Sequence, residues 1–376
     1  MNPLLRLKEF GQTIYLDEFR RSWLKNGKLK GLIDDDGLAG VTSNPSIFHK
    51  AIVDSNDYDD AIADHARKGA DAKATYEDLT ISDISEAADL FRPMFDASGG
   101  LDGMVSLEVS PELAHDEDGT VKEAHHLWKR LDRPNIFIKV PATDAGVPAI
   151  RRLIADGVNV NVTLLFGLPR YRQVADAFLT GLEERLKAGK SVNVMSVASF
   201  FLSRIDVMID PKLDALASQP VPQATAAHQL RGTAAISSAK RAYVIYEELF
   251  GAGSERFARL AKAGARPQRL LWASTSTKDP SYSDVKYVEP LIGPDTINTL
   301  PLKTIDDYRD HGNPAARIKE GADDALAMLQ ALTGVGVNLE TVVAKLEDEG
   351  VAKFIKANDE LLAAIEASLK AAPTRA

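Results

Sequence analysis

The chain contains no cysteine among its 376 residues. Disulfide bonds, zinc sites built on thiolates and cysteine nucleophiles are therefore excluded together. Hydrophobic residues are not scarce, because they make up 45% of the chain. Disordered chains have too few hydrophobic residues to form a buried core, so this composition predicts a globular protein.

Positive charge is in deficit: 45 Lys and Arg stand against 54 Asp and Glu, which gives a net charge of −9. A general nucleic-acid binder needs a basic surface to contact phosphates. We therefore expect no nucleic-acid partner. A local basic pocket for a small phosphorylated ligand is compatible with this balance.

Long hydrophobic runs are missing as well. The longest apolar stretch, around Val158–Leu168, is interrupted by Asn159 and Asn161 and is too short to span a bilayer. The first residues, MNPLLRLKEFGQ, lack the apolar segment and the cleavage site of a signal peptide. We expect a cytoplasmic protein with no membrane association.

Neither a metal site nor a dinucleotide site is indicated. His125 and His126 are adjacent and project to different faces of a helix, and no HxxxH or HExxH spacing occurs. No GxGxxG follows an expected strand. The sequence therefore predicts no bound metal, and it gives no support for a nicotinamide-binding fold.

Short β-branched segments alternate with longer amphipathic segments along the whole chain. This alternation predicts an α/β fold with a parallel sheet, and eight strands close a (β/α)8 TIM barrel. An open, doubly wound sheet is the alternative. The expected strands are Thr13–Asp17, Gly40–Asn44, Met104–Val109, Ile136–Ala142, Val158–Leu165, Val192–Ser199, Leu270–Thr275 and Tyr287–Ile292.

Helical patterns fill the intervals between the strands and continue beyond the last one. Linker signals are weak, so we expect one domain over residues 1–376, with additional helices and a helical C-terminal tail. The expected helices include Ala145–Asp156, Leu168–Ala188, Ala226–Phe250, Ala315–Leu332 and Gly350–Lys370.

Polar side chains gather toward the C-terminal ends of several expected strands. Side chains alternate between the two faces of a strand, and a buried parallel sheet is normally apolar on both faces. Lys139 shares a face with Phe137, and Glu108 shares one with Ser106. Because barrel enzymes keep their active sites at the C-terminal ends of the strands, these departures predict a functional site there.

The charged members of this group have structural alternatives. Lys139 is either a lysine paired with a carboxylate or a buried amine that attacks a carbonyl. Glu108, at a matching height on the preceding strand, suits an ion pair or proton transfer. Asp17 either caps a helix expected over Glu18–Leu24 or acts as a general acid or base.

The remaining candidates are also open to two interpretations. Asn44 either caps the following helix or contacts a ligand. Asn161 and Thr163 either form core hydrogen bonds or line a site. Arg204 and Lys278 are either surface cations or phosphate ligands.

Five segments, each at the end of an expected strand, together resemble the transaldolase family and occur in its order. The resemblance extends from about Asp17 to about residue 300. The segments are GVTSNPSIF (40–48), VSLEVSP (105–111), NIFIKVPAT (135–143), NVNVTLLF (159–166) and SFFLSRID (199–206).

The resemblance implies a (β/α)8 barrel transferase that forms a lysine Schiff base and uses no metal or organic cofactor. It implies that Lys139 is the Schiff-base lysine and that Asp17 is the general acid/base at the C4 hydroxyl. Glu108 and Thr163 are similar to the pair that handles the water released and consumed with the imine.

The substrate contacts implied by the resemblance lie on three of these segments. Asn44, Asn161 and Ser199 are similar to residues that hold the dihydroxyacetone hydroxyls, and Arg204 is similar to a phosphate ligand. Phe201 stands where the short aldolases of the superfamily have a tyrosine, which favours transfer over release.

The sequence departs from the family pattern after the seventh expected strand. Many relatives have a second phosphate-binding arginine there, whereas this chain has WASTSTKDPSY, in which Lys278 is the available cation. The motif after Lys139 also reads Val-Pro-Ala-Thr instead of the family's more familiar Leu-Ala-Ser-Thr.

The expected reaction is transfer of dihydroxyacetone from sedoheptulose 7-phosphate to glyceraldehyde 3-phosphate, giving erythrose 4-phosphate and fructose 6-phosphate in the pentose phosphate pathway. The alternatives are a lysine-dependent aldolase that releases dihydroxyacetone and a non-catalytic barrel that binds sugar phosphates. A monomer and a homodimer are both compatible with the sequence.

Overall fold

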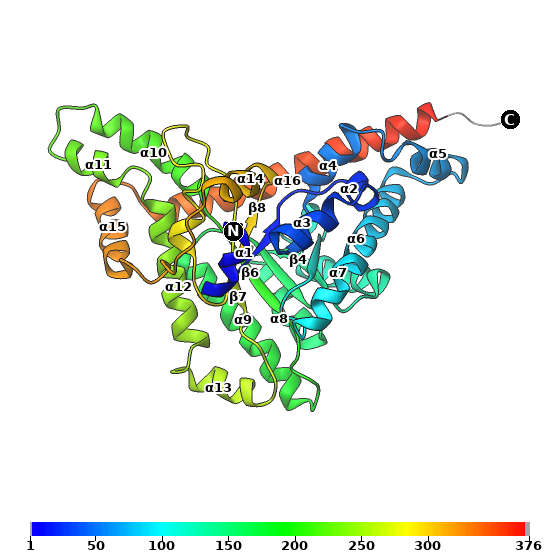
Figure 1. Cartoon of the computed structure of the whole chain (residues 1–376), viewed down its shortest axis with the longest axis horizontal. Helices are drawn as coiled ribbons and strands as arrows, with labels where there is room; N and C mark the ends of the chain where they lie inside the picture. Colours follow the sequence, from blue (N-terminus) through cyan, green and yellow to red (C-terminus); the bar gives the residue numbers. More distant parts are fainter. Residues whose placement is uncertain (1, 373–376) are drawn as a thin grey trace.

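Eight parallel strands form a closed barrel at the centre of the molecule, so the expected (β/α)8 fold is confirmed and the open sheet is excluded (Figure 1). The computed structural model describes residues 2–372. Each strand pairs with the next, and β8 pairs back with β1. The strands are β1 (Gln12–Leu16), β2 (Leu38–Val41), β3 (Met104–Glu108), β4 (Ile136–Pro141), β5 (Val160–Leu165), β6 (Ser196–Phe201), β7 (Arg269–Ala273) and β8 (Thr296–Leu300).

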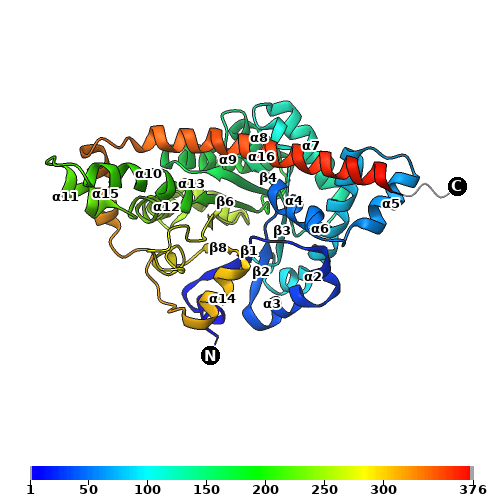
Figure 2. The same cartoon turned by 90° about the horizontal axis from the view of Figure 1, so that it is seen from above.

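Helices surround this barrel on all sides (Figures 1 and 2). Short 3₁₀ helices are η1 (Leu7–Phe10), η2 (Pro111–Leu113) and η3 (Glu289–Leu291). The α-helices are α1 (Pro3–Arg6), α2 (Arg21–Lys25), α3 (Lys28–Asp36), α4 (Pro45–Val53), α5 (Asp59–Arg67), α6 (Ala72–Ala97), α7 (Glu117–Leu131), α8 (Gly146–Asp156), α9 (Leu168–Lys187), α10 (Ser203–Ala217), α11 (Ala224–Leu230), α12 (Ala234–Phe250), α13 (Glu255–Lys262), α14 (Leu302–His311), α15 (Ala322–Gly334) and α16 (Leu339–Ala371).

The eighth strand lies elsewhere than the sequence pattern predicts. The segment Tyr287–Ile292 forms η3 and irregular backbone instead of a strand, and β8 follows it at Thr296–Leu300. Pro290 explains the difference, because proline cannot donate a ladder hydrogen bond within a barrel strand. The sixth strand also begins four residues later than expected, at Ser196 instead of Val192.

Helix boundaries differ from the predictions where glycine interrupts the pattern. The helix expected over Ala226–Phe250 is divided into α11 and α12 around Gly232, whose φ is +70°. α15 begins only after Gly321, whose φ is +64°. Both backbones are left-handed, which glycine adopts at little cost and which ends or delays a right-handed helix.

The C-terminal helix α16 is longer than predicted and crosses the barrel. It begins at Leu339, where the Asn338 side chain accepts a hydrogen bond from Thr341 N, and it extends over 33 residues. Figure 2 shows it running across most of the width of the molecule, and it packs against α4, α5, α6, α10 and β5. The helix α16 therefore packs against the barrel and its surrounding helices at one end of the barrel.

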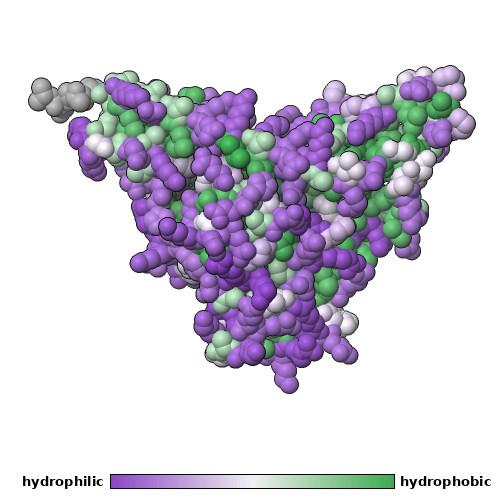
Figure 3. Space-filling model, turned by 180° about the vertical axis from the view of Figure 1, so that it is seen from behind, coloured by the Kyte–Doolittle hydropathy of each residue, from purple (hydrophilic) through white to green (hydrophobic). Residues whose placement is uncertain are grey.

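Buried hydrophobic side chains join into one connected core within the described residues. Hydrophilic residues dominate the face of the molecule shown in Figure 3. Between residues 2 and 372 no single helix is long and apolar enough to cross a membrane, and only α15 with α16, bent by 90° at their junction, reach that length and composition together. The expectation of one domain over residues 1–376 stays a prediction, since residues 1 and 373–376 lie outside the described part.

A buried ion pair joins α2 to α6. Arg21 Nε lies 2.7 Å from Asp83 Oδ1, and Tyr58 Oη donates a hydrogen bond to Asp83 Oδ2 at 2.8 Å. The Arg21 and Asp83 side chains are 10% and 2% exposed. Loss of one partner leaves the other charge buried and unpaired, which costs about 3–5 kcal/mol in comparable pairs.

We therefore expect Asp83→Asn to lower the free energy of unfolding by about 3 kcal/mol, measured by urea denaturation. The matched control is Asp89→Asn, which removes the partner of Arg133 on the exposed side of the same helix and should cost less than about 1 kcal/mol. Equal losses in the two variants would show that burial of the Arg21 pair carries no special weight.

Candidate active site

A cavity of about 470 Å³ opens at the C-terminal ends of the barrel strands. This volume lies within the range of roughly 300–1,000 Å³ that is common for small-molecule sites. The predicted site residues that line it are Asp17, Asn44, Lys139, Thr163, Ser199, Phe201, Arg204 and Lys278. The structure thus brings together all the candidates except Glu108 and Asn161, which lie beside and beneath the cavity.

Lys139 lies on β4 with its side chain only 5% exposed. Its Nζ donates a hydrogen bond to the Ser43 carbonyl at 2.8 Å and lies 3.2 Å from Glu108 Oε2. The two residues are direct neighbours in the β3–β4 register. Burial raises the pKa of Glu108, and the positive charge of Lys139 opposes that rise. The pair therefore combines a buried amine with a carboxyl group that is able to hold a proton.

Asp17 follows directly after β1 and faces the same cavity. It does not cap a helix: α2 begins at Arg21, with Arg20 in the N-cap position. Thr42 Oγ1 donates a hydrogen bond to Asp17 Oδ1 at 3.0 Å. Burial raises the pKa of Asp17, while Lys139 most strongly opposes the rise. A carboxyl group with a raised pKa in a cleft is suited to general acid/base chemistry.

A chain of hydrogen bonds lies beneath the cavity floor. Ser199 Oγ donates to Asn161 Oδ1 at 2.7 Å, and Asn161 Nδ2 donates to Ser106 Oγ at 3.1 Å. These residues come from three strands, β6, β5 and β3. Asn161 therefore fixes the orientation of the Ser199 hydroxyl, which lines the cavity.

β5 is irregular where it reaches the cavity. Its pairing with β6 shifts register between Val162 and Leu165, and Leu164 has a φ of +52°. A positive φ is rare for a branched side chain and commonly marks a functional site. Thr163 lies within this irregularity, and its buried Oγ1 has no hydrogen-bond partner in the described part of the chain. Such a hydroxyl is available to a ligand or a water.

Asn44 combines the two roles considered for it. Its side chain accepts a hydrogen bond from Ile47 N at 3.0 Å and thereby caps α4. The same side chain also belongs to the lining of the cavity. Helix capping therefore holds Asn44 in place at the site.

Cations and aromatic rings form the outer part of the cavity. The Arg204 guanidinium lies 5.3 Å from the centre of the Phe201 ring, and Phe201 in turn packs against Phe166 at 5.2 Å. Burial lowers the pKa of Arg204, which the charges of Asp17 and Glu108 oppose, and burial together with the positive charge of Arg204 lowers the pKa of Lys278. Arg204 is thus a half-buried cation and not an ordinary surface residue.

Sequence reasoning missed several lining residues. Most are hydroxyl or small residues, which carry little signal in a single sequence, and two belong to the C-terminal helix. They are Thr42, Ser203, Val207, Ala273, Ser274, Ser276, Thr299, Lys353 and Phe354.

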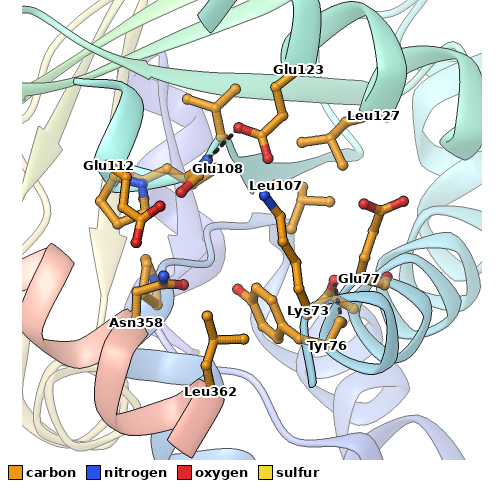
Figure 4. Close-up of a pocket in the computed structure, with 15 residues that line it drawn as sticks. Lys73, Tyr76, Glu77, Leu107, Glu108, Glu112, Glu123, Leu127, Asn358 and Leu362 are labelled. Atoms are coloured by element: carbon orange, nitrogen blue, oxygen red, sulfur yellow. Dashed lines mark hydrogen bonds between the residues drawn. The ribbon is translucent and has the colours of Figure 1, made fainter. Parts of the chain in front are cut away.

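A second cavity lies on the outer side of β3, among α6, α7 and α16 (Figure 4). It encloses only about 60 Å³ and is lined by apolar side chains together with polar ones, including Lys73, Tyr76 and Glu123. Glu123 accepts a hydrogen bond from Ser110 N at 3.0 Å, which Figure 4 marks. This space is too small for a sugar phosphate. In residues 2–372 no group of three or more His, Asp or Glu side chains is placed to hold a metal ion.

Comparison with known proteins agrees with this geometry. Residues 14–365 match the family described as transaldolase/fructose-6-phosphate aldolase. The chain is 46% identical over 374 residues to a protein named transaldolase from Mycobacterium tuberculosis, with 99% of this chain and 98% of that protein covered. It is 46% identical over 372 residues to a transaldolase from Thermobifida fusca, with 98% and 99% covered, and 44% identical over 376 residues to transaldolase 2 from a Nostoc species, with 98% of each covered. The chain therefore belongs to the transaldolase/fructose-6-phosphate aldolase family.

Proposed function

We propose that the central cavity carries out transaldolase chemistry, with Lys139 as the nucleophile. The single observation that carries the assignment is the Lys139 amine, buried 3.2 Å from Glu108 in a cavity that also holds Asp17. The reaction moves a dihydroxyacetone unit from sedoheptulose 7-phosphate to glyceraldehyde 3-phosphate, giving erythrose 4-phosphate and fructose 6-phosphate. This transfer belongs to the pentose phosphate pathway.

The first half of the reaction breaks the C3–C4 bond of the ketose. Lys139 Nζ adds to the C2 carbonyl, and loss of water gives an iminium ion that accepts the electron pair of the C3–C4 bond. Asp17 takes the proton of the C4 hydroxyl as C4 becomes the aldehyde carbon of the departing aldose. A dihydroxyacetone enamine remains on Lys139.

The second half of the reaction reverses these steps with another aldose. C3 of the enamine attacks the acceptor aldehyde, and Asp17 returns its proton to the new hydroxyl oxygen. Water then adds to C2 of the iminium ion and releases the new ketose from Lys139. Glu108 and Thr163 move protons to and from this water. Glu108 contacts the amine, and the buried Thr163 hydroxyl has no hydrogen-bond partner within the described residues, which supports these roles.

Hydroxyl and phosphate recognition divides between the floor and the mouth of the cavity. Asn44 and Ser199, the latter oriented by Asn161, hold the hydroxyls of the three-carbon unit. Arg204 and Lys278 bind the phosphate, which a guanidinium and an ammonium group both suit. These contacts keep the enamine in place until the acceptor arrives.

The ligands we propose are small sugar phosphates, handled without a metal or organic cofactor. We also propose that the enzyme works in the cytoplasm, without nucleic-acid or membrane partners, as a monomer or a homodimer. Size determination in solution distinguishes the last two.

The proposed function is tested by trapping the imine. Borohydride is added in the presence of fructose 6-phosphate, and the peptides are mapped by mass spectrometry. We expect a reduced three-carbon adduct on Lys139. Absence of the adduct while the ketose still binds would reduce the chain to a sugar-phosphate-binding barrel.

A lysine-dependent aldolase is the second candidate, because the family includes fructose-6-phosphate aldolases. Phe201 favours transfer: its apolar ring, packed on Phe166, supplies no hydroxyl to protonate the enamine. Assays with and without erythrose 4-phosphate separate the two activities. Steady release of free dihydroxyacetone without an acceptor would support the aldolase.

The Thr42 hydroxyl provides a prediction about pH dependence. Its hydrogen bond lowers the pKa of Asp17, whose ionised form is the base in C3–C4 cleavage. Thr42→Val removes that bond, so the pKa of Asp17 rises. Asp17 is then protonated, and activity is lost, at a higher pH than in the unaltered chain. We expect the acidic limb of kcat/KM to move upward by about 0.5–1 pH unit.

Thr299→Val is the matched control, because within residues 2–372 Thr299 Oγ1 lies 2.9 Å from Thr42 Oγ1 but forms no hydrogen bond with Asp17. Its acidic limb should stay close to that of the unaltered chain. A Thr42 variant with an unmoved limb would show that another group sets the acidic pKa.

A further inference from the structure

The long helix α16 contributes Lys353 and Phe354 to the lining of the catalytic cavity. Lys353 also lines an adjoining groove of about 620 Å³ between α10 and α16, which shares Arg204 and Val207 with the cavity. The side chain therefore stands at the boundary between the cavity and its outer approach. The proposed reaction assigns no role to Lys353.

Lys353 differs from the other lysines of its helix in its partners. Lys345, Lys356 and Lys370 each pair with a glutamate one turn away, at 3.6, 3.8 and 2.6 Å. Lys353 forms no ion pair within 4.0 Å in residues 2–372, although Glu349 is one turn before it and pairs with Lys345 instead. Its ammonium group is thus free for a ligand.

The packing of α16 fixes where this lysine lies. Phe354, next in the chain, is 3% exposed and anchors the helix over the cavity. At Gly350, one turn earlier, an added Cβ would meet Leu164 Cδ2 at 2.9 Å and lie 3.7 Å from Arg204 Nη1. The absence of a side chain at residue 350 lets the helix approach Arg204 closely.

Three cations consequently meet at the mouth: Arg204, Lys278 and Lys353 all line the same cavity. Lys278 is close enough to both others for their charges to disfavour its protonated form. In the part of the chain that the structure describes, Arg204 and Lys353 form no ion pair, and the Lys278 ammonium group donates its one hydrogen bond to the Ser276 hydroxyl. Like charges repel, so their gathering favours an anionic ligand between them.

We propose that Lys353 is a specificity-determining residue that binds the phosphate group of the sugar substrate from α16. The inference rests on the proposed function and extends it to α16, which lies outside the segments that resemble the transaldolase family. An ammonium group on a flexible stem adapts to phosphates at different depths. Arg204 is held against Phe201, whereas Lys353 reaches the mouth of the cavity from a separate element.

The test compares Lys353→Met with Lys356→Met. Both variants remove one positive charge from α16, but Lys356 lines only the outer groove and pairs with Glu360. We expect Lys353→Met to raise the KM for fructose 6-phosphate about tenfold, with kcat within about twofold, as for loss of one charge-assisted hydrogen bond. The inhibition constant of inorganic phosphate should rise in parallel. Lys356→Met should leave both constants within about twofold.

Unphosphorylated fructose separates phosphate binding from a structural effect. Its kcat/KM should be the same in Lys353→Met and in the unaltered chain, because it offers no phosphate to the lysine. An equal loss for fructose and fructose 6-phosphate would overturn the assignment, as would identical KM values in the two variants.

Borohydride trapping distinguishes the failure of this inference from the failure of the proposed function. A normal adduct on Lys139 with unchanged KM values overturns only the role of Lys353. If the unaltered chain forms no adduct with fructose 6-phosphate, the proposed function and this inference fall together.

Discussion

Replacing Lys139 with alanine is expected to abolish turnover and adduct formation while the barrel remains folded. The amine is the group that joins the substrate, and the other two lysines that line the cavity within residues 2–372, Lys278 and Lys353, lie at its mouth. Without the imine, breaking C3–C4 would leave a carbanion with no electron sink. We expect activity to fall by at least about 10⁴-fold, as for the loss of other covalent nucleophiles.

Lys139→Met serves as a second variant, because methionine retains most of the volume of the aliphatic stem and limits cavity formation. Both variants should bind fructose 6-phosphate without forming a borohydride-stable adduct. Residual activity near that of the unaltered chain in either variant would remove Lys139 from the mechanism.

Lys286→Met is a matched control for the loss of a buried lysine. Lys286 is 13% exposed and lies 3.1 Å from Asp206, yet it does not line the catalytic cavity. The folded fraction of the Lys286→Met variant should still form the Lys139 adduct. This comparison separates the chemistry of the amine from the general cost of removing a buried ion pair.

Replacement of Lys139 should also change how the free energy of unfolding depends on pH. Removing Lys139 takes away the charge that opposes the rise in the pKa of Glu108. The folded pKa of Glu108 then exceeds its unfolded value by more, so the folded state binds the proton more tightly. As pH rises from about 5 to 8, the free energy of unfolding should therefore fall more in the Lys139 variants than in the unaltered chain. Urea denaturation at the two pH values measures both changes.

Part of this site follows from sequence alone because it depends on strand alternation. Glu108 and Lys139 occupy neighbouring register positions, as their places in two consecutive strands predict. In a parallel barrel the C-terminal ends of all strands meet at one end, so recognising the strands is enough to group the side chains. The ion pair needed no knowledge of helix packing.

Other parts of the site depend on contacts that a single sequence does not specify. The contact of Thr42 with Thr299 requires the position of β8, which the strand-like pattern of Tyr287–Ile292 obscured. Lys353 belongs to an amphipathic helix whose pattern reports only which side is buried. The end of the barrel that α16 crosses is decided by its packing against α4, α10 and β5.

Replacing Asp17 with asparagine should leave imine formation intact and slow the cleavage that follows. Asparagine has the same shape, and its Oδ1 still accepts the Thr42 hydrogen bond, but its amide does not take up a proton. General acid/base groups commonly contribute 10²–10⁴-fold, so we expect kcat to fall by about 10³-fold. The acidic limb attributed to Asp17 should also disappear from the pH profile.

The adduct that accumulates identifies the step at which Asp17 acts. If cleavage is slow and imine formation is not, borohydride should trap the intact six-carbon ketose phosphate on Lys139 in the asparagine variant. The unaltered chain should yield the three-carbon unit under the same conditions. Loss of every adduct would instead place Asp17 in imine formation, a role for which Glu108 is better placed, since it lies 3.2 Å from the amine. The mass of the trapped peptide therefore decides between the two carboxylates, because each acts on a different bond of the same substrate.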